Sequence, residues 1–135
     1  MTDQTNAWNP GLKGVVPYLS SKDAAGQLEF YQKAFAAEEH GRMPAEDGKR
    51  IMHSMLKIND GYLMMSDCFP EHGYEYRAPQ GSTMHLQVDD PQAWFDRAEA
   101  AGCTVTLPMQ VMFWGDRYGQ LKDPYDVMWS IGGPA

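Results

Sequence analysis

Two histidines in short apolar segments are the residues of this sequence best suited to chemistry. His53 lies in IMHSMLKI, residues 51–58, and His85 lies in STMHLQVDD, residues 82–90. An imidazole with an unperturbed pKa of about 6.5 can transfer a proton, hydrogen-bond a ligand or bind a metal ion. The alternative for both residues is a structural histidine that only holds neighbouring strands together.

Motifs for nucleophilic catalysis and nucleotide binding are missing from the sequence. Cys68 and Cys103 are far apart, have no metal-binding spacing and have no readable partner histidine. No GxSxG element occurs, and none of Gly61, Gly115 and Gly119 links a strand to the start of a helix as a phosphate-binding loop does. We therefore expect two free thiols and no nucleotide.

Composition and charge exclude several classes of protein. The chain has 135 residues, of which 43% are hydrophobic and 12% aromatic, enough for the core of one domain. Its 11 Lys and Arg residues are scattered, and 18 Asp and Glu residues bring the net charge to −7. Nucleic acid binders normally show the opposite pattern, whereas acid gathered around a pocket favours a cationic small molecule. Without a signal peptide or a long apolar run, we expect a cytoplasmic protein with neither a nucleic-acid nor a membrane partner.

Hydrophobic periodicity predicts the elements that position these residues. Residues 1–13 are polar and turn-rich and are expected to form an N-terminal tail before the apolar run VVPYL. A helix is predicted after an N-cap at Asp23 or Ser21, because apolar residues recur at helical spacing. These residues are Ala24, Leu28, Tyr31 and Phe35. The runs 51–58 and 62–67 flank Asn59-Asp60-Gly61, which predicts a hairpin.

The second half of the chain repeats this plan. A helix is predicted from Pro91 to a stop at Gly102, and the strand-like segments TVTLPM, RYGQLK and VMWSI follow it. EFYQKAFAA (29–37) aligns with AWFDRAEAA (93–101), and VPYLS (16–20) aligns with TMHLQ (83–87). Each half therefore reads as strand, helix and three strands, which indicates a duplicated module of about 65 residues.

These segments resemble the vicinal-oxygen-chelate superfamily of glyoxalases, bleomycin-resistance proteins and extradiol dioxygenases. The resemblance covers about residues 14–132 and rests on LEFYQKAF, HLQVDDPQAWFDRAEAAG and FWGDRYGQLKDPYDVMWSI. IMHSMLKINDGYLMMSD is most similar to the PhnB-like branch. The resemblance implies an α+β fold of two βαβββ modules, about 14–68 and 82–132, in a single domain spanning 14–135. They would form a cupped mixed sheet with the helices on its convex side.

A homodimer is expected for the same chain. An open curved sheet leaves edges that need cover, and the adjacent aromatics Phe113 and Trp114 lie in a connection beside Gly115. The resemblance implies a dimer as well. A lid over a pocket is the alternative role for the aromatic pair.

Members of the PhnB-like branch also carry the label "3-demethylubiquinone 3-methyltransferase domain". A methyltransferase that uses S-adenosylmethionine needs a glycine-rich loop after its first strand, and SSKDAAGQL provides none. We therefore expect no methyl transfer and no cofactor.

The resemblance also defines where a metal ion would be bound. Metalloenzymes of the superfamily take one ligand from the first and one from the last strand of each module. The matching positions here are Val16, Met65, Thr83 and Ser130. None is His, Glu or Asp, so the set offers a divalent ion no good donor, and we expect no metal site of this kind. A shifted site made of His85, Asp67 and His53 is the alternative.

Period-two alternation predicts which side chains could share a pocket. It assigns Leu86 and Val88 to the helix side of a sheet and leaves Tyr18 and His85 at equivalent places on the other side. We expect a single ligand-binding cavity lined by Tyr18, His53, Met65, His85 and Trp114. The expected function is metal-independent binding of an apolar or aromatic small molecule, with a cationic ligand among the alternatives. The alternative is a metal-dependent lyase, isomerase or dioxygenase-type enzyme with a non-standard metal set and His85 as its acid or base.

Overall fold

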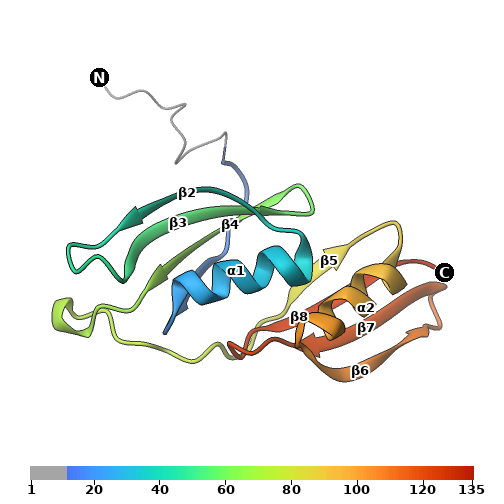
Figure 1. The fold of residues 1–135 in the computed structure, drawn as a ribbon. Helices are drawn as coiled ribbons and strands as arrows, with labels where there is room; N and C mark the ends of the chain where they lie inside the picture. The colour runs from blue at the N-terminus through green and yellow to red at the C-terminus, as the bar shows by residue number, and fades with distance from the viewer. Residues whose placement is uncertain (1–11) are drawn as a thin grey trace. The chain divides into compact units, whose positions relative to one another are not determined.

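The computed structural model describes residues 12–135 and shows the order strand, helix and three strands twice (Figure 1). Two compact units result. Unit 1 comprises the residues up to Gln32 together with Ala36–Arg77, and unit 2 comprises Lys33–Phe35 and Ala78–Ala135. The tail expected at residues 1–13 falls almost wholly outside the described residues. The single domain over 14–135 stays a prediction.

Unit 1 contains a mixed four-stranded sheet in the order β1-β4-β3-β2. Its elements are β1 (Tyr18–Ser21), α1 (Ala24–Phe35), β2 (Glu38–Pro44), β3 (Ile51–Ile58), β4 (Gly61–Asp67) and the 3-10 helix η1 (Pro70–His72). β1 runs parallel to β4, and the other two pairs are antiparallel. A parallel pair needs a long crossover between its strands, and here that crossover contains α1 and two strands.

Unit 2 has the same topology, with its sheet in the order β5-β8-β7-β6. Its elements are β5 (Met84–Gln87), α2 (Pro91–Ala101), β6 (Thr104–Val111), β7 (Asp116–Lys122) and β8 (Met128–Pro134). β5 is parallel to β8, as β1 is to β4. The predicted α+β fold of two βαβββ modules is confirmed.

Both helices begin where the sequence predicts, and α2 also ends where it predicts. The Asp23 carboxylate accepts a hydrogen bond from the Gly26 N–H (3.1 Å), and the Asp90 carboxylate accepts one from the Ala93 N–H (3.1 Å). These N-caps satisfy N–H groups that have no partner inside the helix. α2 ends at Gly102, whose φ of 131° favours glycine. In the described part of the chain, no helix is long and apolar enough to cross a membrane.

The hairpin between β3 and β4 is confirmed. Asn59 and Asp60 both have positive φ values, 50° and 64°, and Gly61 begins β4. Two consecutive left-handed residues match the twist of the flanking strands, and Asn and Asp tolerate this conformation better than most residues. β2 is the element that hydrophobic patterning does not reveal, because its sequence EEHGRMP is polar and mostly exposed.

Strand register decides which side chains share a face in unit 1. Tyr18 pairs with Met64, and Leu19 pairs with Met65. Directly paired residues project from the same face of a sheet, and successive residues alternate. Met65 is fully buried on the face of Leu19, so it lies on the opposite face of the sheet from Tyr18. Met64 occupies the face of Tyr18 instead, and we call this face the open face of unit 1.

In unit 2 the predicted alternation of buried and exposed side chains along β5 is confirmed. Leu86 is buried and pairs with buried Ile131, whereas His85 is exposed and pairs with Ser130. His85 therefore lies on the sheet face away from the core, as Tyr18 does in unit 1. We call this the open face of unit 2.

Candidate functional site

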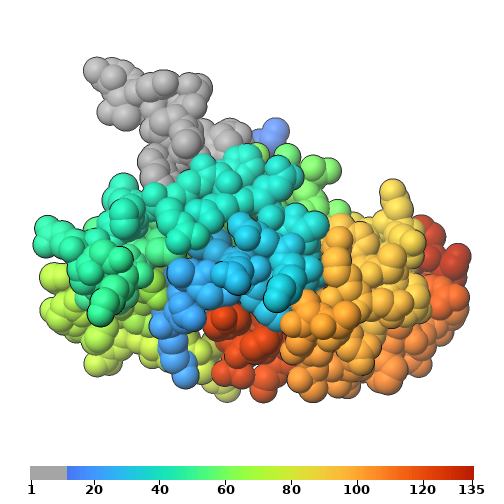
Figure 2. Space-filling view, viewed as in Figure 1, coloured from blue at the N-terminus to red at the C-terminus, as the bar shows by residue number. Residues whose placement is uncertain are grey.

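A pocket of about 920 Å³ lies in unit 1 on the open face of β1 and β4. Its walls come from β1 and β4, from the turn 45–50 with the start of β3, and from the segment 68–74. The turn and the segment lie side by side at one end of unit 1 (Figure 2), joined by an ion pair between Arg50 and Glu71. This volume falls within the range of about 300–1,000 Å³ that is typical of small-molecule sites.

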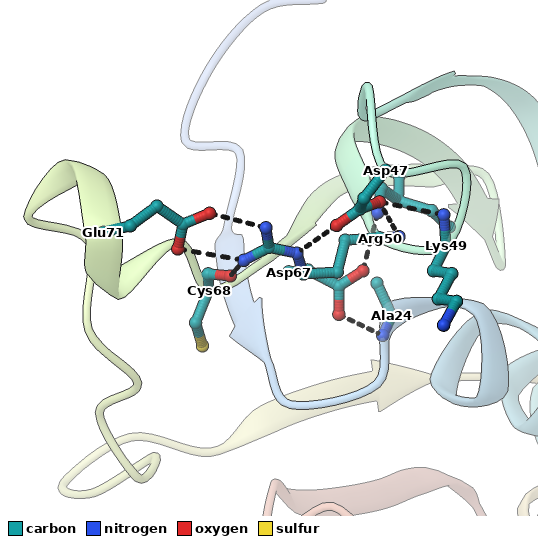
Figure 3. A network of polar contacts seen from close by, with 8 residues as sticks. Ala24, Asp47, Lys49, Arg50, Asp67, Cys68 and Glu71 are labelled. Carbon is teal, nitrogen blue, oxygen red and sulfur yellow. Dashed lines mark hydrogen bonds and ion pairs between the residues drawn. The ribbon is translucent and has the colours of Figure 1, made fainter.

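Arg50 holds the two walls together (Figure 3). Its Nε–H donates to Asp47 Oδ2 (2.7 Å), and its Nη2–H donates to Glu71 Oε2 (2.5 Å). Nη1 donates to Glu71 Oε1 (3.1 Å) and to the carbonyl oxygen of Cys68 (3.3 Å). The planar guanidinium thus binds Glu71 in a bidentate manner and bridges the turn 45–50 to the segment 68–74.

These interactions keep the carboxylates of the network charged. Backbone N–H donors of Arg50 and Lys49, followed by the Arg50 side chain, lower the pKa of Asp47 to about 2. The Arg50 guanidinium lowers the pKa of Glu71 to about 2, and both partners raise the pKa of Arg50. The network is solvent-exposed, so we assign it a role in positioning the pocket walls more than in stability.

Asp67 anchors the inner end of the pocket. Its Oδ1 accepts a hydrogen bond from the Ala24 N–H (2.8 Å), and its Oδ2 accepts one from the Ile51 N–H (2.7 Å) (Figure 3). Asp67 is buried and projects from the same face of β4 as Met65. Its carboxylate therefore joins the start of α1 to the start of β3.

The alternative metal site is not supported by this arrangement. His53 lies on the open face, whereas Asp67 projects from the opposite face of the same sheet, so the two side chains do not converge. Within residues 12–135, no three His, Cys, Asp or Glu side chains are grouped so that they could hold a metal ion.

The segment 68–74 presents two aromatic rings to the pocket. Phe69 and Tyr74 exchange two backbone hydrogen bonds (2.7 and 3.0 Å), which close the loop around η1. Gly73 makes this closure possible with a φ of 85°. The Arg50 guanidinium carbon lies 4.3 Å from the Phe69 ring centroid, a cation–π contact that fixes this ring.

Tyr18 and His53, two of the predicted site residues, lie together on the open face of unit 1. Tyr18 Oη and His53 Nδ1 are hydrogen-bonded at 3.0 Å, and the Tyr18 ring lines the pocket. Burial lowers the pKa of His53 from its ordinary value. His53 is therefore predominantly neutral at pH 7 and adds little positive charge beside the pocket.

Neither cysteine has the properties of a nucleophile. Both are free thiols, and the Cys68 S–H donates to the carbonyl oxygen of Ser21 (3.0 Å). Burial, followed by the nearby Asp67 carboxylate, raises the pKa of Cys68. Burial also raises the pKa of Cys103 to about 12. The reactive thiolate is thus disfavoured at both positions.

His85 lies within a hydrogen-bonded cluster on the open face of unit 2. Its Nε2–H donates to Gln87 Oε1 (2.8 Å), and its Nδ1 is hydrogen-bonded to Ser130 Oγ (2.7 Å). Because the Gln87 carbonyl oxygen can only accept, Nδ1 accepts from the Ser130 hydroxyl in the neutral ring. Both ring nitrogens are engaged, which favours the structural alternative for His85.

Aromatic contacts connect His85 to Trp114. The Tyr118 ring stacks on His85 with centroids 5.9 Å apart, and the Trp114 ring meets Tyr118 at 5.9 Å. Trp114 lies in the connection between β6 and β7 next to Phe113, which is 97% exposed. The dimer and lid roles of this aromatic pair both stay predictions.

The five predicted site residues thus fall into three places. Tyr18 and His53 are in contact, His85 and Trp114 belong to one aromatic cluster, and Met65 is in the core. Their role in ligand binding stays a prediction. Sequence reasoning missed Arg50, which lies in the turn before β3, and also missed Phe69 and Tyr74, which lie between the two predicted modules. The signal was present in CFPEHGYEYR, where aromatics flank Pro70 and Gly73.

Comparisons with known proteins agree with this fold. The family model described as Glyoxalase/Bleomycin resistance protein/Dioxygenase superfamily matches residues 15–131. The chain belongs to this superfamily. An uncharacterized protein of Mycobacterium bovis is 42% identical over 124 residues, which cover 87% of this chain and 81% of that protein.

Two solved structures illustrate the structural similarity. The crystal structure of TioX from Micromonospora sp. ML1 has a TM-score of 0.71 and 24% identity, covering 91% of this chain and 97% of that chain. The structure of the PhnB protein from Bacillus cereus has a TM-score of 0.70 and 14% identity. The match covers 90% of this chain and 99% of that chain. At these identities the similarity establishes the fold, and the likeness to PhnB-like proteins is confirmed at that level.

The positions that correspond to metal ligands in the superfamily do not fit a metal ion in this chain. Met65 is buried on the helix side of its sheet, and the Ser130 hydroxyl is hydrogen-bonded to His85. Val16 and Thr83 lie just outside the strands and carry no imidazole or carboxylate. A neutral set of this kind offers a divalent cation no strong ligand.

Proposed function

We propose that this chain is a metal-independent binding protein for a small molecule, which occupies the unit 1 pocket. The observation that carries the proposal is the pocket itself, whose volume suits a small ligand and whose two walls are held together by Arg50. Aromatic and apolar side chains supply contact area, and polar groups at the rim would orient the ligand. The lining includes Tyr18, Met52, Phe69 and Tyr74 as aromatic or apolar members.

The enzyme alternative finds less support in the site. Acid–base chemistry by His85 would need a ring nitrogen available to the substrate, but Ser130 and Gln87 engage both nitrogens. The Cys68 thiol, which lines the pocket, is protonated at neutral pH and already donates to Ser21. Binding without chemical conversion is therefore the simpler function for this pocket.

Ligand screening in the presence and absence of metal ions tests the proposal. We expect at least one compound of a metabolite library to raise the melting temperature equally in protein treated with EDTA and in protein supplied with Zn²⁺, Ni²⁺, Mn²⁺ or Fe²⁺. Tyr74→Ala should weaken the binding of that compound about fivefold or more, because it removes an exposed aromatic wall of the pocket. Trp94→Ala, which removes a half-buried aromatic residue of α2 that does not line the pocket, serves as the matched aromatic control and should leave the affinity unchanged.

Two results would contradict the proposal. One is a stoichiometric metal ion in protein purified without chelator, together with ligand binding that disappears on its removal. The other is an affinity that Tyr74→Ala leaves unchanged for every compound found.

A further inference from the structure

We infer that the unit 1 pocket selects an organic cation, a protonated amine attached to an aromatic or apolar group. This inference rests on the proposed function, because it names the class of ligand for the same pocket. Three observations support it: the excess of acidic residues in the lining, the hydrogen bonds that occupy Arg50, and the aromatic rings at the rim.

Carboxylates outnumber cations in the lining. Four acidic residues, Glu46, Asp47, Asp67 and Glu71, line the pocket together with a single arginine, Arg50. With histidines neutral, the formal charge of the lining is therefore negative, and two of the carboxylates remain ionised down to a pH of about 2. A concave surface lined by one sign of charge concentrates ligands of the opposite sign.

Arg50 is not available to bind an anion. Four N–H···O contacts commit its guanidinium to Asp47, Glu71 and the Cys68 carbonyl oxygen. A guanidinium has five N–H donors, so no bidentate pair remains for a carboxylate or phosphate. The side chain that would favour an anionic ligand is thus neutralised within the wall.

Glu46 is the carboxylate best placed to meet a ligand cation. It lies in the turn 45–50 beside Asp47, is exposed, and lines the pocket. Among the described residues, no Lys or Arg pairs with Glu46 within ion-pair distance, whereas Arg50 pairs with both Asp47 and Glu71. A ligand ammonium could therefore interact with Glu46 without displacing an existing ion pair.

The aromatic rings complete a surface for a cation. Tyr18 and Tyr74 are 53% and 71% exposed, so both rings are accessible from the pocket side. The Phe69 ring already has the Arg50 guanidinium against it, which leaves the two tyrosines as the open aromatic surfaces. A cation near an aromatic ring is stabilised by the ring quadrupole, and an apolar substituent gains contact area there.

Three probes with the same ring and different charge test the inference. Benzylamine, benzyl alcohol and benzoate are titrated into ¹⁵N-labelled protein at pH 7, and dissociation constants are taken from shifts of pocket amides. We expect benzylammonium to bind about threefold more tightly than benzyl alcohol and about tenfold more tightly than benzoate, with an affinity that falls as salt is added.

Glu46→Gln provides the matched variant, because it removes a charge without disturbing the Arg50 network. Benzylammonium affinity should fall about two- to fivefold, the range of an exposed charge pair, while benzyl alcohol affinity stays the same. Glu99→Gln on α2 makes the same charge change at an exposed residue that does not line the pocket, and it should alter neither affinity.

The outcomes separate this inference from the proposed function. Equal or tighter binding of benzyl alcohol or benzoate at the pocket amides would overturn the preference for a cation and leave the proposed binding function intact. Equal loss of benzylammonium affinity in Glu46→Gln and Glu99→Gln would also overturn it, because the effect would then come from net charge alone. If none of the three probes shifts a pocket amide, both proposals fail.

Discussion

Replacing Asp123 with alanine is expected to lower the free energy of unfolding by about 3–5 kcal/mol. Asp123 is only 3% exposed, and its carboxylate accepts three hydrogen bonds. The donors are the backbone N–H groups of Tyr125 (2.8 Å) and Val127 (3.0 Å) and the indole N–H of Trp129 (2.9 Å). Alanine would leave these three donors without an acceptor, and the hydrogen bonds from Val127 and Trp129 are buried. A hydrogen bond to a charged group contributes about 1.5–3 kcal/mol.

Urea unfolding of the variant measures this loss. Asp123→Asn should lose less, because its amide oxygen can still accept from the backbone N–H groups while its NH₂ group faces the Trp129 indole. Asp89→Ala, an exposed aspartate with the same change of charge and size, should stay within about 0.5 kcal/mol of the original protein. A loss below 1 kcal/mol for Asp123→Ala would show that the carboxylate does not organise this turn.

Asp67→Ala is expected to have the second-largest effect and to lower the free energy of unfolding by about 2–4 kcal/mol. Its buried carboxylate accepts hydrogen bonds from the N–H groups of Ala24 and Ile51, both of which are far from Asp67 in the sequence. Without it, the start of α1 and the start of β3 lose their common acceptor. Because Arg50 immediately precedes Ile51, we also expect the pocket walls to shift and ligand affinity to fall.

The Asp67 variants separate the structural role from the ligand-binding role. Asp67→Asn keeps one carbonyl acceptor and should lose about half as much stability in urea unfolding. Stability of Asp67→Ala equal to that of Asp89→Ala would contradict the account of Asp67 as the link between α1 and β3. If Asp67→Ala destabilises the protein but leaves ligand affinity unchanged, the pocket walls do not depend on the hydrogen bonds of Asp67.

The sequence predicts the elements of the fold well where local physics dominates. Periodic apolar residues and a capping aspartate locate α1, and Pro91 and Gly102 locate α2. Asn59-Asp60-Gly61 locates the hairpin, because such signals act over a few residues. β2 escapes prediction because it is polar, and its place in the sheet depends on pairing with β3. Strand pairing of this kind leaves no signature in the hydrophobic pattern of the strand itself.

The position of Met65 relative to Tyr18 has a similar explanation. Two strands joined by a tight turn have a register that the turn fixes, but β1 and the parallel strand β4 are joined through a long crossover. A shift of one residue moves every side chain to the other face, so Met64 lies with Tyr18 and Met65 enters the core. Alternation within β1 could be predicted, but its register against β4 could not.

The pocket itself depends on contacts that sequence spacing does not show. Arg50 and Glu71 are distant in the sequence, and their bidentate pair determines where Phe69 and Tyr74 lie. The predicted modules end at residue 68 and resume at residue 82, so these aromatics were left between them. A segment with several aromatics around a proline and a glycine is better treated as a candidate wall than as a linker.

Chemical-shift mapping with the first ligand found tests the central claim most directly. The ¹⁵N–¹H spectrum of EDTA-treated protein is recorded with and without that ligand, and the shifted amides are assigned. We expect the largest shifts at Tyr18, Arg50, Phe69 and Tyr74, with saturable binding at one site. Shifts confined to the cluster of His85, Tyr118 and Trp114, or binding that requires an added metal ion, would contradict it.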